Sequence, residues 1–215
     1  MADINWKPME FYDLSKEERT ELVEEMREEI LSGLKENELE PIERYASDDD
    51  TYIRKNAYLI LGRTYRDEED SRERILNFVG KLILKSDEKK RQTAVYTLGE
   101  IGKVEADKVL DYFKIALADE HHSVRNAVVG FLKQMGESNP EPTLEFARKF
   151  LHHPDPEVRK LIVHGIELRG RTHPQDVLPF LEELQEDPDE KVRKKIVHVL
   201  SQISYKEGCL ERVVL

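Results

Sequence analysis

The sequence predicts an all-α protein, a right-handed α-solenoid (superhelix) of about five helical hairpins with an N-terminal capping helix. The main observation is a repeat: five arginines stand 37, 34, 34 and 34 residues apart, each within a similar phrase. These are Arg54, Arg91, Arg125, Arg159 and Arg193. A fixed period of this length is typical of repeat folds, in which each unit buries its apolar face against its neighbours.

The second observation is the helical spacing of apolar residues within each phrase. Counted from the arginine, apolar residues recur at positions +3, +4 and +7, which lie on one face of a helix. These second helices of the hairpins are expected at 53–66, 89–103, 124–136, 158–171 and 191–204. A first helix precedes each, at about 37–46, 73–85, 105–118, 143–153 and 176–186. Glycines at Gly102, Gly136 and Gly170 are expected to cap the second helices.

The N-terminal segment carries a helix signal of its own. Ser15 followed by Glu18 is a capping box, so a helix is expected to begin there. It should run to about Leu31, with Gly33 ending it. Aromatic residues lie in the segment before it and are expected to pack on this helix and cover the open end of the array: Trp6, Phe11 and Tyr12.

The predicted organisation is one continuous array. Residues 1–33 form the N-terminal segment and capping helix, 34–205 the five repeats, and 205–215 a closing segment in which we expect Cys209 to be buried. The repeats are placed at approximately 34–66, 71–103, 104–137, 138–172 and 173–204.

The repeated arginines are interpreted as structural. Each lies within the apolar arc of its helix, where the aliphatic stem must pack and the guanidinium needs acceptors. Every repeat has an aspartate six or four residues before its arginine. The predicted structural ladder comprises Arg54, Arg91, Arg125, Arg159 and Arg193 with Asp48, Asp87, Asp119, Asp155 and Asp187.

The phrase D-x-x-V-R-x-x-A-x-x-x-L-G, repeated over residues 34–205, resembles the HEAT repeats of the PBS-lyase type. This resemblance implies that the arginine–aspartate pairs form a ladder along the solenoid. It also implies that the second helix of each pair lines a concave face. The expected role is a non-catalytic scaffold that binds a protein partner.

A second, more distant resemblance concerns residues 157–181. The stretch EVRKLIVHGIELRGRTHPQDVLPFL is similar to a repeat of the HEAT-like DNA alkylation repair family. That family places tryptophans and a catalytic aspartate on its concave face. Here His164 stands at the comparable aromatic position, and the only tryptophan, Trp6, precedes the repeats. The alternative function is therefore a nucleic-acid binding protein of this glycosylase-like class that lacks the usual catalytic residues.

Charge is divided unequally between the two helices of each hairpin. The five second helices sum to +16, so the rest of the chain, whose total is −11, carries −27. The solvent arc of these helices is the candidate binding surface for an anionic partner: Lys55, Arg63, Tyr96, Lys133, Lys160, His164, Arg171, Lys194 and His198. Three interpretations stay open here: an acidic protein partner, a nucleic acid, or lysines that only solvate exposed helices.

Several function classes receive no support from the sequence. Cys209 is the only cysteine, so an intrachain disulfide is excluded and a cytoplasmic location is expected. No apolar run reaches the ~20 residues of a membrane span, and no secretory signal is present at the start. No complete catalytic signature is present, so enzymatic activity stays open without a candidate catalytic residue, and no cofactor or metal is expected.

Overall fold

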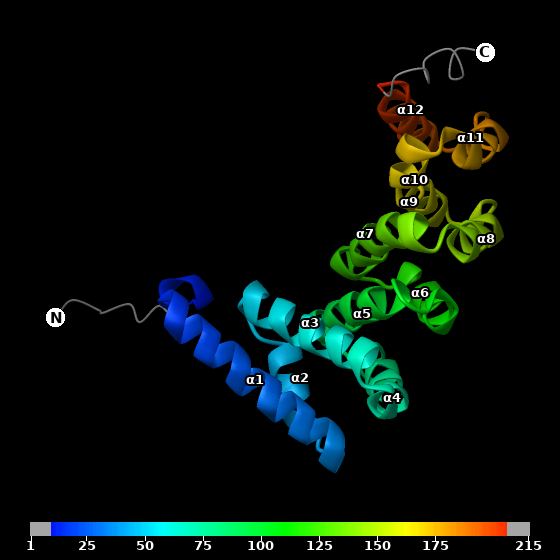
Figure 1. The fold of residues 1–215 in the computed structure, drawn as a ribbon. Coiled ribbons are helices and arrows are strands. Elements are labelled where there is room, and N and C mark those ends of the chain that lie inside the picture. The colour runs from blue at the N-terminus through cyan, green and yellow to red at the C-terminus, as the bar shows by residue number, and fades with distance from the viewer. Residues whose placement is uncertain (1–9, 206–215) are drawn as a thin grey trace. The chain divides into compact units, whose positions relative to one another are not determined.

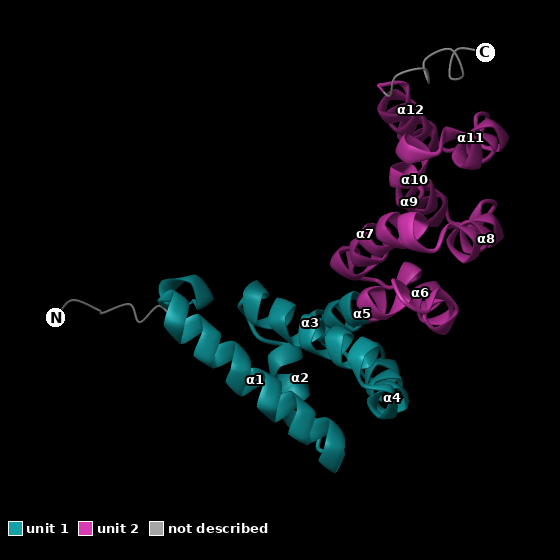
Figure 2. Cartoon of the chain, in the orientation of Figure 1, with its two compact units in different colours: residues 1–97 teal, residues 98–215 magenta. Residues whose placement is uncertain are grey.

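The computed structural model describes residues 10–205, and within this range the chain is all-α and without strands. It divides into two compact units, residues 1–97 and 98–215, which Figure 2 shows in different colours. Helix α5 (Glu88–Gly102) begins in the first unit and ends in the second. Trp6, Cys209 and the closing segment after residue 205 lie outside the described residues, so their expected packing stays a prediction.

Unit 1 holds the N-terminal helix and the first hairpin. Helix α1 (Lys16–Glu36) packs on α2 (Glu40–Ala46) and on α3 (Thr51–Asp67), and α3 contacts α4 (Arg72–Leu82). Short 3-10 turns at Phe11–Asp13 and Glu69–Ser71 precede α1 and α4. Met26, Ile30, Ile42 and Leu61 are fully buried, which fixes how α1 lies on the hairpin.

Unit 2 consists of two layers of helices (Figure 1). The second helices α7 (His122–Ser138), α9 (Pro156–Gly165), α10 (Glu167–Thr172) and α12 (Glu190–Ser204) pack beside one another. The second layer runs along one side of this row and consists of the first helices α6 (Leu110–Leu117), α8 (Pro140–Phe150) and α11 (Pro174–Glu183). A 3-10 turn at Ala106–Lys108 precedes α6.

The beginning of α1 is as the sequence predicts, but its end is not. Ser15 and Glu18 form both bonds of the capping box, at 3.2 Å and 2.7 Å. The expected stop at Gly33 is wrong, because α1 continues to Glu36 and Asn37 supplies the left-handed cap with φ 60°. Gly33 serves the turn differently: its carbonyl accepts from Glu38, and a Cβ at Gly33 would lie 2.5 Å from the Glu38 carbonyl oxygen.

The repeated glycines also have another role than the expected caps. Gly136 and Gly170 lie inside α7 and α10, and none of the three expected caps has a positive φ. A Cβ at Gly170 would lie 2.9 Å from Ile203, and one at Gly102 would lie 2.7 Å from Met135. At these two sites the glycine is required because a side chain of the next second helix occupies the space where a Cβ would be.

Two further expectations need correction. The fourth second helix is not continuous, because the turn residue Ile166 separates α9 from α10. Val197, expected on the buried face at position +4, is 66% exposed, whereas its counterpart Val163 is fully buried. Val163 lies on α9, against which α12 packs. Val197 lies on α12, and no further hairpin follows α12 within residues 10–205.

Each of the five repeated arginines donates to a main-chain carbonyl at the same relative position in its own hairpin. In each hairpin, Nη1 donates to the carbonyl six residues earlier, at 2.5–3.0 Å: Asp48, Lys85, Asp119, His153 and Asp187. These carbonyls lie in the turn after the first helix, where the helix leaves its last acceptors unpaired. The guanidinium therefore ties the second helix to the turn that precedes it.

Aspartates four residues before the repeated arginines accept hydrogen bonds from the backbone, and two of them, Asp87 and Asp155, belong to the predicted ladder. Asp50, Asp87, Asp155 and Asp189 each accept from main-chain N–H groups at the start of the following helix, at 2.7–3.2 Å. They are N-caps, the common role of aspartate at this position. In the third hairpin His121 takes this place.

The pair of Arg159 and Asp187 joins two successive repeats. Arg159 donates through Nε and Nη2 to the two carboxylate oxygens of Asp187, at 2.7 and 2.8 Å. Both residues are buried, at 8% and 6% exposure, and the pair lowers the pKa of the Asp187 carboxyl below its usual range. Arg159 thus links its own turn to the turn of the next hairpin.

We expect Arg159→Ala to destabilise the protein by about 3–5 kcal/mol, because it leaves the buried Asp187 carboxylate without its partner. Urea unfolding followed by circular dichroism measures this change. The matched control is Arg27→Ala, which removes an exposed pair with Glu24 and should cost less than about 1 kcal/mol. Equal losses in the two variants would contradict the structural role assigned to Arg159.

A pair of glycine substitutions tests the close approach of helices within unit 2. A Cβ at Gly99 would lie 2.0 Å from the Phe131 ring, whereas one at Gly130 would meet no atom within 4 Å. Gly99→Ala should therefore destabilise by about 1–3 kcal/mol through overpacking. Gly130→Ala should stabilise by about 0.5–1 kcal/mol, since alanine favours the helix interior. Thermal or urea unfolding of both variants decides, and a stabilising Gly99→Ala would refute the packing described.

Candidate partner-binding site

The second-helix layer of unit 2 concentrates positive charge. Helices α7, α9, α10 and α12 contain ten basic and four acidic side chains, a formal charge of +6, although the whole chain carries −11. We call the exposed surface of these four helices the basic layer. Within it, five side chains from all four helices come together, and they form the candidate site: Lys133, His164, Glu167, Lys195 and His198.

A buried carboxylate lies at the centre of this site. Glu167 is 6% exposed, and its Oε2 lies 3.1 Å from Lys133 Nζ, which donates a hydrogen bond. The same oxygen lies 3.3 Å from His164 Nε2 and 3.7 Å from His198 Nε2. The two imidazole rings meet edge to face, with centroids 6.3 Å apart. One carboxylate thus holds three nitrogen-bearing side chains from three different helices in a fixed arrangement.

Local structure explains this placement. Glu167 is the first residue of α10, directly after the turn residue Ile166, which is 1% exposed and anchors the junction in the core. His164 lies in the last turn of α9, three residues before Glu167. A Cβ at Gly165 would lie 2.9 Å from Leu132, so glycine at this position lets α7 approach closely enough for Lys133 to reach the carboxylate.

The electrostatic environment changes the protonation of these groups. Burial, together with the positive charges of Lys133 and Lys195, lowers the pKa of His164 to about 4, so this imidazole is neutral at pH 7. Burial also opposes the charge of Glu167, but the hydrogen bond and charge of Lys133 outweigh it, and the pKa of the carboxyl is lowered. Burial lowers the pKa of Lys195, with further lowering from Lys133 and Lys160.

The residues expected from the sequence fall into two groups in unit 2. Lys133, His164 and His198 contact Glu167, whereas the other three form no ion pair with it within residues 10–205. Lys160 pairs with Glu157 at 2.6 Å, Lys194 pairs with Glu190 at 2.6 Å, and Arg171 is exposed on α10. Glu167 and Lys195 were not among the predicted site residues. A signal for Glu167 existed, since it stands eight residues after its repeated arginine, the position at which the preceding repeat has Lys133.

Three expected site residues belong to unit 1. Lys55 and Arg63 are exposed on α3, and the Tyr96 ring stacks on Tyr58 with centroids 5.0 Å apart. That all nine predicted residues share one concave face stays a prediction.

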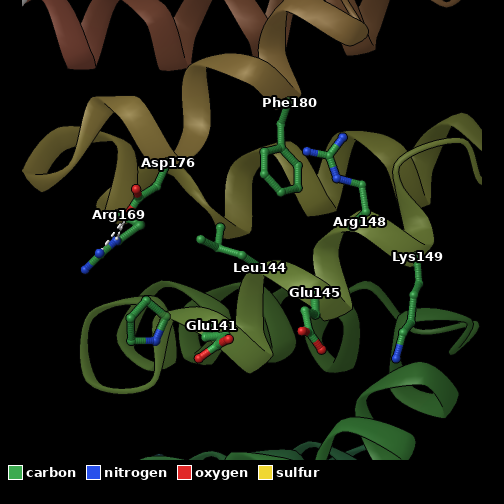
Figure 3. Close-up of a pocket in the computed structure, with 9 residues that line it drawn as sticks. Glu141, Leu144, Glu145, Arg148, Lys149, Arg169, Asp176 and Phe180 are labelled. Atoms are coloured by element: carbon green, nitrogen blue, oxygen red, sulfur yellow. Dashed lines mark hydrogen bonds and ion pairs between the residues drawn. The ribbon is translucent and has the colours of Figure 1, made fainter.

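The other layer of unit 2 contains a groove that the sequence did not predict. It lies between α8 and α11, has a volume of about 630 Å³, and has Leu144 and Phe180 among its lining residues (Figure 3). Arg148 lies 4.1 Å over the Phe180 ring and pairs with Glu183, and Arg169 pairs with Asp176 at 2.6 Å. The two arginine charges at this groove are therefore balanced within the protein.

Residues 10–205 contain no group of three or more histidine, cysteine, aspartate or glutamate side chains arranged to hold a metal ion. In the same range, every helix is too short or too polar to cross a membrane. The rings of His121 and His122 lie close, with centroids 4.8 Å apart. His121 is the N-cap of α7, and His122 is the first residue of that helix.

The low pKa of His164 gives a testable titration. In the unfolded chain a histidine has a pKa of about 6.5, so as pH falls from 6.5 toward 4 the unfolded state binds the proton first. Wild type should therefore lose stability across this window, and His164→Gln should lose less. The Hε1 resonance of His164, assigned with that variant, should titrate at about pH 4. A midpoint near 6.5 would show that the ring is not buried among positive charges.

Comparisons with known proteins agree with the fold. A family model described as HEAT repeats matches residues 144–211. No curated protein sequence matches the chain. Among solved structures, AlkD2 from Streptococcus mutans is similar with a TM-score of 0.61 at 15% identity, covering 88% of each chain. The protein smu.31 from Streptococcus mutans UA159 gives a TM-score of 0.58 at 17% identity, again over 88% of each chain. Residues 144–211 therefore match HEAT repeats, and the chain has a helical-repeat fold like that of AlkD2.

Proposed function

We propose that the basic layer of unit 2 binds an acidic polypeptide segment and that the protein acts as a non-catalytic scaffold. The observation that carries this proposal is the convergence of Lys133, Lys195 and two histidines on one buried carboxylate. A surface on which one sign of charge is gathered attracts partners of the opposite sign.

The buried carboxylate supports a binding role in a specific way. Lysine side chains that only solvate a helix are flexible and lose considerable conformational entropy when a ligand fixes them. Lys133 is already held by Glu167 at 3.1 Å, with a side chain only 25% exposed. Part of the ordering cost is thus met before a ligand arrives, which favours binding over simple solvation.

The cluster leaves positive charge available for a ligand. Glu167 offsets one of the two lysine charges, and His164 is neutral at pH 7. Lys195 is desolvated, which lowers its pKa and makes an added negative charge favourable beside it. His198, whose side chain is 46% exposed, is a donor at the surface of the site. A glutamate or aspartate of a partner would meet both groups.

Charge reversal of the layer tests the proposal. Lys160→Glu with Lys195→Glu should weaken binding of a fluorescein-labelled glutamate-rich peptide at least about tenfold, since two attractive charges become repulsive. The matched control, Lys108→Glu with Lys114→Glu, makes the same charge change at exposed residues of the other layer and should alter affinity less than about twofold. Fluorescence anisotropy at 50 mM salt measures both. An equal loss in the two variants would refute a specific site.

Duplex DNA is the alternative ligand. The sequence of residues 157–181 resembles a repeat of the DNA alkylation repair family, and the fold is similar to that of AlkD2. A chain with a net charge of −11 should bind DNA weakly. The same anisotropy assay with a 20-base-pair duplex at 50 and 200 mM salt decides. DNA binding that is tighter than peptide binding and falls by orders of magnitude at 200 mM would replace the present proposal.

A further inference from the structure

The N-terminal part of unit 1 carries as much negative charge as the whole chain. Residues 10–50 contain 16 acidic and five basic side chains, a formal charge of −11. Helices α1 and α2 and the turn before α3 carry most of this charge. Such a region attracts cations and repels the acidic ligand proposed for unit 2, so its own ligand would be positively charged.

A pocket lies where this acidic region meets exposed aromatic rings. It has a volume of about 570 Å³ and is lined by seven residues: Glu10, Tyr12, Asp48, Asp49, Asp50, Thr51 and Tyr52. All seven come from the segment before α1 or from the turn and first residues of α3. Four of the seven are acidic and none is basic.

Main-chain hydrogen bonds hold the aromatic walls in position. Asp50 accepts from the N–H of Tyr52 at 2.7 Å through Oδ1, and from the N–H of Phe11 at 2.6 Å through Oδ2. This single carboxylate ties the N-terminal segment to the start of α3. The Tyr12 and Tyr52 rings then stand at 84° with centroids 4.3 Å apart. They remain 59% and 41% exposed, so both rings are accessible to a ligand.

The protein's own cations near the pocket leave part of its charge unpaired. Lys89 forms an ion pair with Asp49, and Arg54 donates to the carbonyls of Asp48 and Asp49. Arg19 lies 5.0 Å over the Tyr12 ring. Within residues 10–205, the carboxylates of Asp48 and Asp50 form no ion pair and accept only main-chain N–H groups.

We propose that this pocket binds the side chain of a lysine or arginine from a basic polypeptide segment. An aromatic face attracts a cation through its quadrupole, and two tyrosine rings beside carboxylates that form no ion pair within residues 10–205 supply both parts of such a site. Arg19 already makes this contact with Tyr12 from one side. The net charge of residues 10–50 would steer a basic segment toward the pocket. This site lies in a different unit from the basic layer and does not depend on its function.

A labelled basic peptide tests the proposal: lysines and arginines separated by glycines, measured by fluorescence anisotropy at 50 mM salt. Tyr12→Ala should weaken binding about threefold through loss of one cation–π wall. Asp48→Asn added to it should bring the loss to about tenfold. The same peptide with acetylated lysines and with citrulline in place of arginine should not bind.

Matched controls separate the pocket from general attraction to an acidic protein. Tyr205→Ala removes a tyrosine that is 86% exposed in unit 2, and Asp111→Asn removes an exposed carboxylate on α6. The double control should change affinity less than about twofold. If it weakens binding as much as the pocket double variant, attraction is unspecific and the proposal fails. Circular dichroism confirms that all variants are folded.

The chain contains a basic side chain close to the pocket in sequence, Lys7, which lies outside the described residues. A Lys7→Ala variant distinguishes a partner's lysine from this one. Binding of the peptide by wild type, with the losses given above, supports the proposal. Binding by Lys7→Ala alone would overturn it and assign the pocket to the chain's own N-terminal segment. No binding by either protein would also overturn it.

Discussion

The hydrogen bond between each repeated arginine and the carbonyl six residues before it is the interaction on which the architecture rests. It fixes the angle between the turn and the second helix in all five hairpins. The helix that follows can then present the same apolar positions to its neighbours in every repeat. At Arg159 the same guanidinium also reaches Asp187 of the next hairpin, so one side chain sets both the local turn and the spacing between repeats.

The candidate site is a consequence of that spacing. Lys133, His164 and His198 belong to three successive repeats, and stacking of the repeats brings their helices side by side. The charges of Lys133 and Lys195, which lie near one another there, repel unless a counter-charge lies beside them. Glu167 is that counter-charge, and its burial makes each contact stronger than it would be in water. The scaffold and the electrostatic cluster are therefore two results of one repeated geometry.

Much of the fold could be predicted because the periodic spacing of side chains in the sequence indicates the helices and the repeats. The 34-residue spacing and the +3, +4 and +7 pattern locate the helices within a few residues, and the capping box at Ser15 is local chemistry. The arginine acceptors could not be predicted, since main-chain carbonyls exist in every residue and leave no mark in the sequence. The burial of Glu167 depends on side chains 31 to 34 residues away, on other helices. The turn at Asn37 depends on how α1 meets α2, which no local pattern states.

The central claim is that an acidic ligand meets the protein at the layer formed by α7, α9, α10 and α12. The most direct measurement is an NMR titration of isotope-labelled protein with an unlabelled glutamate-rich peptide, following amide and side-chain resonances residue by residue. The account predicts the largest shifts at Lys195, His198 and the residues around Glu167, with little change in α6, α8 and α11. Shifts centred on the groove between α8 and α11, or none at saturating peptide, would contradict it.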